Sequence, residues 1–263
     1  MLYSLLGKNQ LEKGEILVML KLELTIILKE LFALGGNHDP EKALGVRKKL
    51  VGFINEEELY LKREYSEDFE TAKAAIYLID AMNVYATTSD RVEGYLHMKP
   101  FFERLIQFEI WGYYDLHLFI SSINFIVKIE DAIELSSKAL KAMENFKDAH
   151  NTAVMEGVLA CNMCSRLLYA KYFDESSKVD LAEHFNRWFS RLEPLVEINY
   201  ELSLPFLATE IRQALFNQDD KQLQELCKDL HEGYDEDVES AITNEISFHT
   251  NSPKYKALQE KAS

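Results

Sequence analysis

Two cysteines, Cys161 and Cys164, have the spacing of a thioredoxin-like redox pair or of half a zinc site. They lie inside a predicted helix, with no predicted strand before them and no second pair of ligands. The nearest histidine in the sequence, His150, would lie about 16 Å from Cys161 along a continuous helix, too far to share a metal ion. We therefore predict no metal here and interpret both thiols as small residues of a helical core, with a regulatory thiol as the alternative.

No other pattern of residues favours catalysis. The triplet Asn37-His38-Asp39 could bind a metal or transfer a proton, but it lies in a loop where Asp39 is predicted to cap the next helix. The remaining histidines lack the H-E-x-x-H spacing, and the sequence contains no G-x-S-x-G, Walker or G-x-G-x-x-G motif. We therefore predict that the chain is not an enzyme and uses no cofactor.

A stripe of polar and aromatic side chains follows one face of the helix predicted for residues 151–173. Its members recur at helical spacing and are Met155, Asn162, Arg166, Tyr169 and Phe173. An asparagine amide carries both a donor and an acceptor, so it can bond the C=O and the N–H of a peptide bond together. This stripe is therefore a candidate surface for an extended peptide, with the aromatic rings and Met155 forming pockets for its side chains.

The helix predicted to begin near Trp111 carries a comparable stripe of Tyr114, His117, Ser121, Asn124 and Lys128. From the two stripes together we predict a peptide-binding site that includes Tyr114, His117 and Asn124. The alternative is that these amides and hydroxyls only satisfy buried helix ends and one another.

Long helices must position these stripes, and the composition favours them. The 263 residues include only five prolines and ten glycines, too few for the frequent turns of a strand-rich protein. Helix-capping and helix-breaking residues, together with the 3.6-residue period of the apolar residues, predict ten helices. Eight of them cover residues 17–34, 40–53, 66–85, 91–110, 130–145, 151–173, 177–192 and 219–230, and the other two start near Trp111 and Leu195. Asp39 is the predicted N-cap of the second helix, and Pro100 is expected to bend or divide the fourth.

Nearly uncharged helices alternate with charged ones in the C-terminal two-thirds of the chain. Between Trp111 and Val127 the only formal charge is Asp115. The helix pairs start about 40 residues apart, a period typical of helical solenoids. We predict an all-α, right-handed, tetratricopeptide-like solenoid of about five helix pairs, with the apolar helices lining the concave surface. It would span residues 22–250, between an N-terminal extension (1–21) and a frayed polar tail (251–263).

The charge of the chain argues against nucleic-acid binding. Forty-four acidic residues face 29 basic ones, which gives a formal net charge of −15. A field of that sign repels phosphate backbones. The densest basic cluster, residues 47–49, is interpreted as a solvated helix face.

The sequence also predicts a cytoplasmic protein with no membrane contact. The first residues contain no sustained apolar run of the kind found in signal peptides. The apolar stretch from Ile16 to Leu34 is interrupted by four charges, which a membrane span would not tolerate: Lys21, Glu23, Lys29 and Glu30.

The segment from Phe108 to Phe119, FEIWGYYDLHLF, resembles the W-G-Y-Y/F-E-L-x-L-F segment of the Rgg (Rgg/GadR/MutR) family of bacterial transcription regulators. The octapeptide IEDAIELS at 129–136 and the helix pair that follows extend this resemblance. It implies a cytoplasmic homodimer whose C-terminal helical repeats bind a short pheromone peptide on their concave face, as in quorum sensing. Asn162 falls near an inner-helix asparagine that contacts peptide in such regulators.

The N-terminus departs from the family pattern, in which a helix-turn-helix domain of roughly 65 residues comes first. Only about twenty residues precede the first repeat-like helix here, although residues 11–15, LEKGE, are similar to the F-E-R-G-E close of that domain. We therefore predict a sensing module that lacks its own DNA-binding domain, either a truncated chain or a natural stand-alone sensor. The alternative function is a scaffold that forms heterodimers with full-length regulators.

Overall fold

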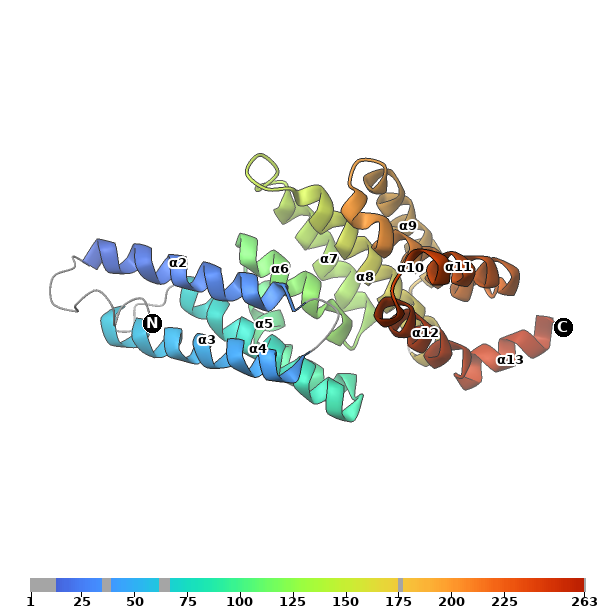
Figure 1. Cartoon of the computed structure of the whole chain (residues 1–263), viewed down its shortest axis with the longest axis horizontal. Coiled ribbons are helices and arrows are strands. Elements are labelled where there is room, and N and C mark those ends of the chain that lie inside the picture. Colours follow the sequence, from blue (N-terminus) through green and yellow to red (C-terminus); the bar gives the residue numbers. More distant parts are fainter. Residues whose placement is uncertain (1–12, 35–38, 62–66, 175–176, 263) are drawn as a thin grey trace. The chain divides into compact units, whose positions relative to one another are not determined.

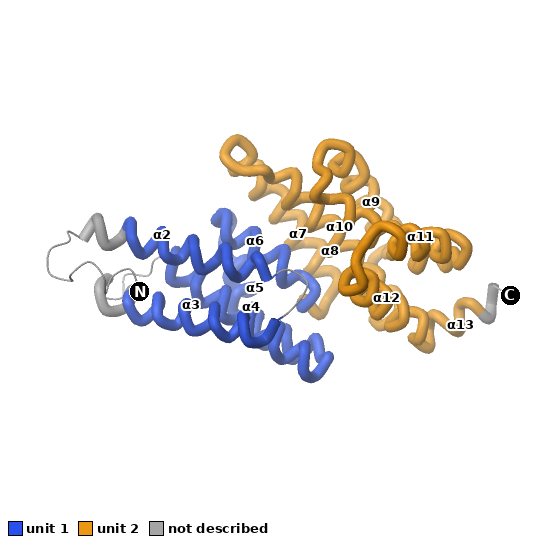
Figure 2. The backbone as a smooth tube through the Cα atoms, viewed as in Figure 1, with its two compact units in different colours: residues 1–125 blue, residues 126–263 orange. Residues whose placement is uncertain are grey.

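A computed structural model of the chain describes residues 13–34, 39–61, 67–174 and 177–262 (Figure 1). Within these ranges the secondary structure comprises twelve α-helices and two short 3₁₀ helices, with no strand. The predicted all-α class is therefore confirmed. The chain divides into two compact units, residues 1–125 and residues 126–263 (Figure 2).

Unit 1 contains α2 (Lys13–Phe32), α3 (Pro40–Leu61), α4 (Glu67–Thr88), α5 (Arg91–Gln107), α6 (Tyr113–Ser122) and the 3₁₀ helix η1 (Ile123–Phe125). The helix α2 packs on α3, α3 packs on α4, and α4 packs on both α5 and α6. Asp39 caps α3 as predicted, because its Oδ1 accepts hydrogen bonds from the backbone N–H groups of Glu41 and Lys42 at 3.0 and 3.1 Å. Pro100 lies inside α5, which continues through it.

Unit 2 contains α7 (Ile129–Met143), α8 (Thr152–Phe173), α9 (Leu181–Val196), the 3₁₀ helix η2 (Tyr200–Leu202), α10 (Ser203–Asn217), α11 (Asp220–Gly233), α12 (Glu236–Thr250) and α13 (Pro253–Ala262). The longest of these, α8, packs against α7, α9, α10 and α13. Most of its buried residues are small or apolar, and Leu159, Met163 and Leu167 among them are fully buried. This packing fixes the rotation of α8, and therefore fixes which of its side chains reach the surface.

Several predicted boundaries differ from the structure, and α3, predicted for residues 40–53, continues to Leu61. The helix expected to start near Leu195 starts at Ser203, because α9 continues through Pro194 to Val196. The sequence did not single out α12, whose apolar period is weak. Residues 253–262, expected as a frayed tail, form α13: Ser252 caps it by accepting from the Tyr255 N–H at 3.1 Å, and the Tyr255 ring is buried against Tyr172. The predicted extension, residues 1–21, lies largely outside the described residues, and α2 begins within it.

The segment that carries the family resemblance forms the junction between α5 and α6. Trp111 is buried, and its indole N–H donates to the carbonyls of Leu105 and Phe108 at 3.1 and 3.3 Å, at the end of α5. Asp115 accepts from the Gly112 N–H at 3.1 Å and pairs with Arg104. These contacts give the W-G-x-x-D positions a structural role at a helix junction.

None of the described helices combines the length and the apolar character that crossing a membrane would require.

Candidate functional site

The stripe predicted on α8 divides into a buried and a half-buried part. Met155 and Arg166 are buried, whereas Asn162, Tyr169 and Phe173 are half-buried. Asn162 and Tyr169 are seven residues apart, so they lie on the same face of the helix. This half-buried row is the part of the predicted surface that a ligand could reach without displacing the core.

Arg166 serves the structure of unit 2. Its side chain is fully buried, Nε donates to the carbonyl of Ile126 at 2.9 Å, and Nη2 donates to the carbonyl of Val127. The guanidinium therefore fastens the segment before α7 to α8 through charge-assisted hydrogen bonds. This is the kind of role foreseen in the alternative interpretation of the stripe, and peptide binding by Arg166 stays a prediction.

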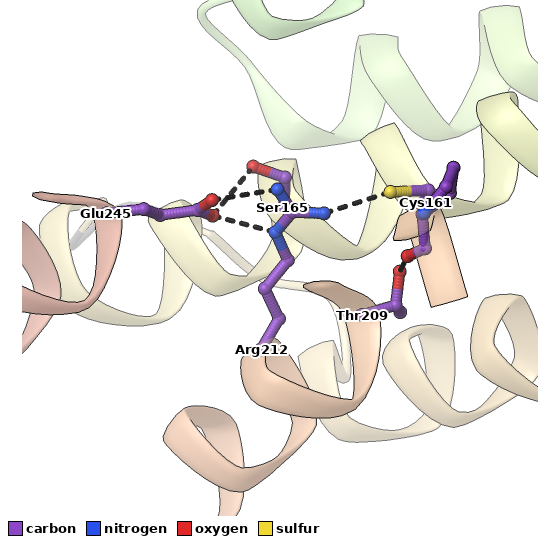
Figure 3. Close-up of polar contacts among 6 residues, drawn as sticks. Cys161, Ser165, Thr209, Arg212 and Glu245 are labelled. Atoms are coloured by element: carbon purple, nitrogen blue, oxygen red, sulfur yellow. Dashed lines mark hydrogen bonds and ion pairs between the residues drawn. The ribbon is translucent and has the colours of Figure 1, made fainter. Parts of the chain in front are cut away.

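A bidentate ion pair joins α10 to α12 beside the half-buried row (Figure 3). Arg212 donates from Nε and Nη2 to the two carboxylate oxygens of Glu245 at 2.7 and 2.8 Å, and the side chains are only 13% and 25% exposed. Ser165 on α8 also donates to Glu245, at 3.5 Å. Burial alone would raise the pKa of the Glu245 carboxyl, but the charge and hydrogen bonds of Arg212 outweigh burial and lower it.

The same guanidinium contacts Cys161, whose Sγ accepts from Nη1 of Arg212 at 2.9 Å (Figure 3). On α10 itself, Thr209 donates to the carbonyl of Pro205 at 2.6 Å, which satisfies its buried hydroxyl. Cys161 and Cys164 are both buried and free, so the prediction that they belong to the core is confirmed. Burial raises the pKa of the Cys164 thiol far above its ordinary value, which keeps it protonated and unreactive.

Three aromatic rings from α8 and α12 stack beside this ion pair; we call Tyr169, Phe173 and Phe248 the aromatic ladder. The ring centroids lie 4.8 Å apart for Tyr169 and Phe173, 4.7 Å for Phe173 and Phe248, and 6.2 Å for Tyr169 and Phe248. Phe248 is 50% exposed although its ring stacks on Phe173. The ladder therefore presents an apolar surface on the same face of α8 as Asn162.

His249, the neighbour of Phe248, points into the interior of unit 2. It is 3% exposed and contacts the rings of Tyr172 and Phe173 at centroid distances of 6.0 and 5.7 Å. Its Nδ1 atom has no hydrogen-bond partner among the described residues. Burial lowers the pKa of His249 to about 4, with the attraction of Glu245 and the repulsion of Arg212 acting in opposite directions.

The predicted site residues near Trp111 belong to unit 1 and contact other parts of that unit. The Tyr114 hydroxyl donates to Oγ1 of Thr25 on α2 at 3.1 Å, and the His117 ring stacks on Phe32 of α2 at 4.9 Å. Asn124 is exposed, and its main-chain carbonyl accepts from Nε of Arg91 at 2.6 Å. Tyr114 and His117 thus join α6 to α2, and a peptide contact for these three residues stays a prediction.

Sequence reasoning found the α8 row but missed its partners on α10 and α12. Arg212 and Glu245 lie 33 residues apart with no motif between them, so nothing in the sequence paired them. Phe248 carried one usable signal, because it is a large apolar residue followed by a histidine in an otherwise polar segment.

The side chains gathered at this face are polar, aromatic and ionic groups of the kind that make noncovalent contacts. The described ranges contain no group of His, Cys, Asp and Glu side chains arranged to hold a metal ion. An amide, an apolar aromatic surface and a fixed ion pair can recognise a chain with polar backbone and apolar side chains. No family model, curated protein or solved structure matches the chain.

Proposed function

We propose that the chain is a ligand-binding helical-repeat module that receives a short apolar peptide on the surface formed by Asn162 and the aromatic ladder. The observation that carries this proposal is the half-exposed ring of Phe248 stacked on two half-buried rings of α8. Aromatic side chains grouped in this way stabilise bound apolar side chains at interfaces.

Asn162 supplies the polar half of the proposed recognition. It is half-buried on α8, two helical turns before Tyr169, so it can bond a peptide backbone whose side chains lie on the rings. The two helices that form this face are fixed relative to each other, because the Arg212–Glu245 pair and Ser165 hold α12 beside α8. Such preorganisation lowers the entropy lost on binding.

The wider setting of this function follows the resemblance to Rgg-type regulators. In this proposal the pairs α8–α9 and α10–α11 of unit 2 are tetratricopeptide-like repeats of a right-handed solenoid, and the chain acts as a homodimeric sensor whose ligand changes transcriptional output. The alternation of apolar and charged helices supports the assignment of repeats.

The test is affinity selection from a defined library of synthetic apolar octapeptides, followed by calorimetric titration of the selected peptides. We expect Asn162→Ala and Phe248→Ser each to weaken binding by about tenfold to a hundredfold, as loss of an anchoring contact does. Tyr200→Ser is the matched control, because Tyr200 is an exposed aromatic residue outside this face. Selection of no peptide, or binding that both variants leave unchanged, would contradict the proposal.

A further inference from the structure

The end of α12 contacts α8 through a histidine in a buried and largely aromatic site. His249 is fully buried between Tyr172 and Phe173, and its Nδ1 has no hydrogen-bond partner among the described residues. A neutral imidazole fits such an apolar site, whereas an imidazolium would lose its hydration without compensation. The contact between α12 and α8 is therefore suited to one protonation state only.

The charged and titratable groups around His249 do not remove this preference. Glu245 lies one turn earlier on α12, but both of its carboxylate oxygens accept hydrogen bonds from Arg212 of α10. Arg212 itself repels an imidazolium. From α8 the phenol of Tyr172 faces the ring and donates to the carbonyl of Leu215, and from α13 Tyr255 packs on Tyr172. Glu245 attracts a protonated His249, but its carboxylate is already paired with Arg212, whose repulsion opposes that attraction.

The beginning of α12 responds to acid in the opposite direction. His231 near the end of α11 places Nδ1 3.1 Å from both carboxylate oxygens of Glu239 on α12. The hydrogen bond to Glu239, followed by its charge, raises the pKa of this exposed histidine. Mild acid therefore strengthens the attachment of the N-terminal half of α12 to α11.

We propose that the end of α12 is an acid-released segment, in which protonation of His249 frees the residues after Glu245 from α8, while the Arg212–Glu245 and His231–Glu239 pairs retain the rest of the helix. Release moves Phe248 off Tyr169 and Phe173 and so dismantles the aromatic ladder. The release itself follows from the burial of His249 and does not depend on what the face binds. Its consequence for binding rests on the proposed function.

The test is hydrogen exchange of the full chain, followed by mass spectrometry, with protection factors referenced to unstructured peptides at the same pH. Given the pKa of about 4 for the buried His249 and about 6.5 for a released one, the end of α12 is expected to lose about 30-fold in protection between about pH 7.5 and pH 5. His249→Phe and His249→Gln should abolish most of this loss, whereas His231→Gln should retain it. Peptides from α8 serve as the internal reference.

Two results would overturn the proposal: a wild-type chain in which the protection of the end of α12 does not change with pH, or an equal loss in both His249 variants. If neither variant folds, the imidazole of wild-type His249 is titrated by nuclear magnetic resonance, and a midpoint at about 6.5 or above overturns it. A chain that selects no peptide but shows the release would contradict the proposed function alone.

Discussion

Residues that combine charge with burial determine how unit 2 is held together. Arg166, Arg212 and Glu245 each place a formal charge in a largely buried position, and each charge is met by fixed partners. Such groups contribute little when they are paired, but they destabilise strongly when one partner is removed. Removing one partner is therefore the direct test of the contacts around α12.

We predict that Arg212→Met lowers the free energy of unfolding of unit 2 by about 3 kcal/mol, because Glu245 would be left buried without its counter-charge. The double variant Arg212→Met/Glu245→Gln should recover a substantial part of this loss, since no unpaired charge remains. Urea unfolding followed by tryptophan fluorescence measures both.

An exposed ion pair gives the matched control for that experiment. Lys221 and Glu225 on α11 pair at 3.9 Å with both side chains mostly exposed, so Lys221→Met should change the free energy of unfolding by less than about 0.5 kcal/mol. Equal losses in the single and double variants at Arg212 and Glu245 would contradict the importance of the unpaired carboxylate.

The sequence predicted candidate residues better than it predicted their partners. Helical spacing placed Asn162 and Tyr169 on one face of α8, which depends only on local geometry. The same spacing grouped Arg166 with them, but its carbonyl partners at Ile126 and Val127 lie 40 and 39 residues away. Contacts at that separation depend on tertiary packing, which the local spacing of residues in the sequence does not reveal.

At the scale of elements, the sequence predicted helix starts that carry their own signals. Asp39, Asp90 and Asp219 each accept from backbone N–H groups of the first turn of a helix, and capping of this kind is local chemistry. The helix α12 also has a capping aspartate, because Asp235 accepts from the Val238 N–H at 3.0 Å, but only Ile242 and His249 are buried in it and the sequence did not single it out. Its position is set by Arg212, Tyr172 and Phe173, which belong to other helices.

The junction between α5 and α6 supplies a prediction about an element boundary. Asp115 satisfies the Gly112 N–H at the start of α6 and pairs with Arg104 of α5. We predict that Asp115→Ala lowers the free energy of unfolding of unit 1 by about 2 kcal/mol, because it leaves a largely buried guanidinium and an N–H without this partner. Urea unfolding observed through Trp111 measures the change.

The conservative variant Asp115→Asn distinguishes the hydrogen bond to Gly112 from the ion pair with Arg104. An amide oxygen can still accept a hydrogen bond from the Gly112 N–H. This variant should therefore lower the free energy of unfolding of unit 1 by less than Asp115→Ala does. A junction that tolerates alanine without loss would show that Trp111 alone holds the end of α5 against α6.

At the scale of the whole molecule, the two tryptophans of the chain report on the two units separately. Trp111 is buried in unit 1 and Trp188 is buried in unit 2. Trp188→Phe therefore leaves a reporter of unit 1, and Trp111→Phe leaves a reporter of unit 2. Each variant has one emitting indole, so its unfolding midpoint belongs to one unit.

We predict that mild acid weakens unit 2 before unit 1. Because the pKa of His249 is about 4 when folded and about 6.5 when unfolded, its contribution is complete above pH 6.5 and is lost as the pH falls toward 4. At pH 5 the loss is about 2 kcal/mol. The lowered pKa of Glu245 acts in the same direction, but only below its unfolded value of 4.5.

The measurement is the urea midpoint of each single-tryptophan variant at pH 7.5 and at pH 5. The Trp188 signal should shift to lower urea in acid by more than the Trp111 signal, and adding His249→Gln should remove the difference. The net charge of −15 falls toward zero near the pI of about 5.0, which relieves repulsion in the molecule as a whole. That relief opposes the histidine effect, so a selective weakening of unit 2 identifies the buried imidazole as its source, whereas a parallel shift of both signals would assign the pH dependence to overall charge.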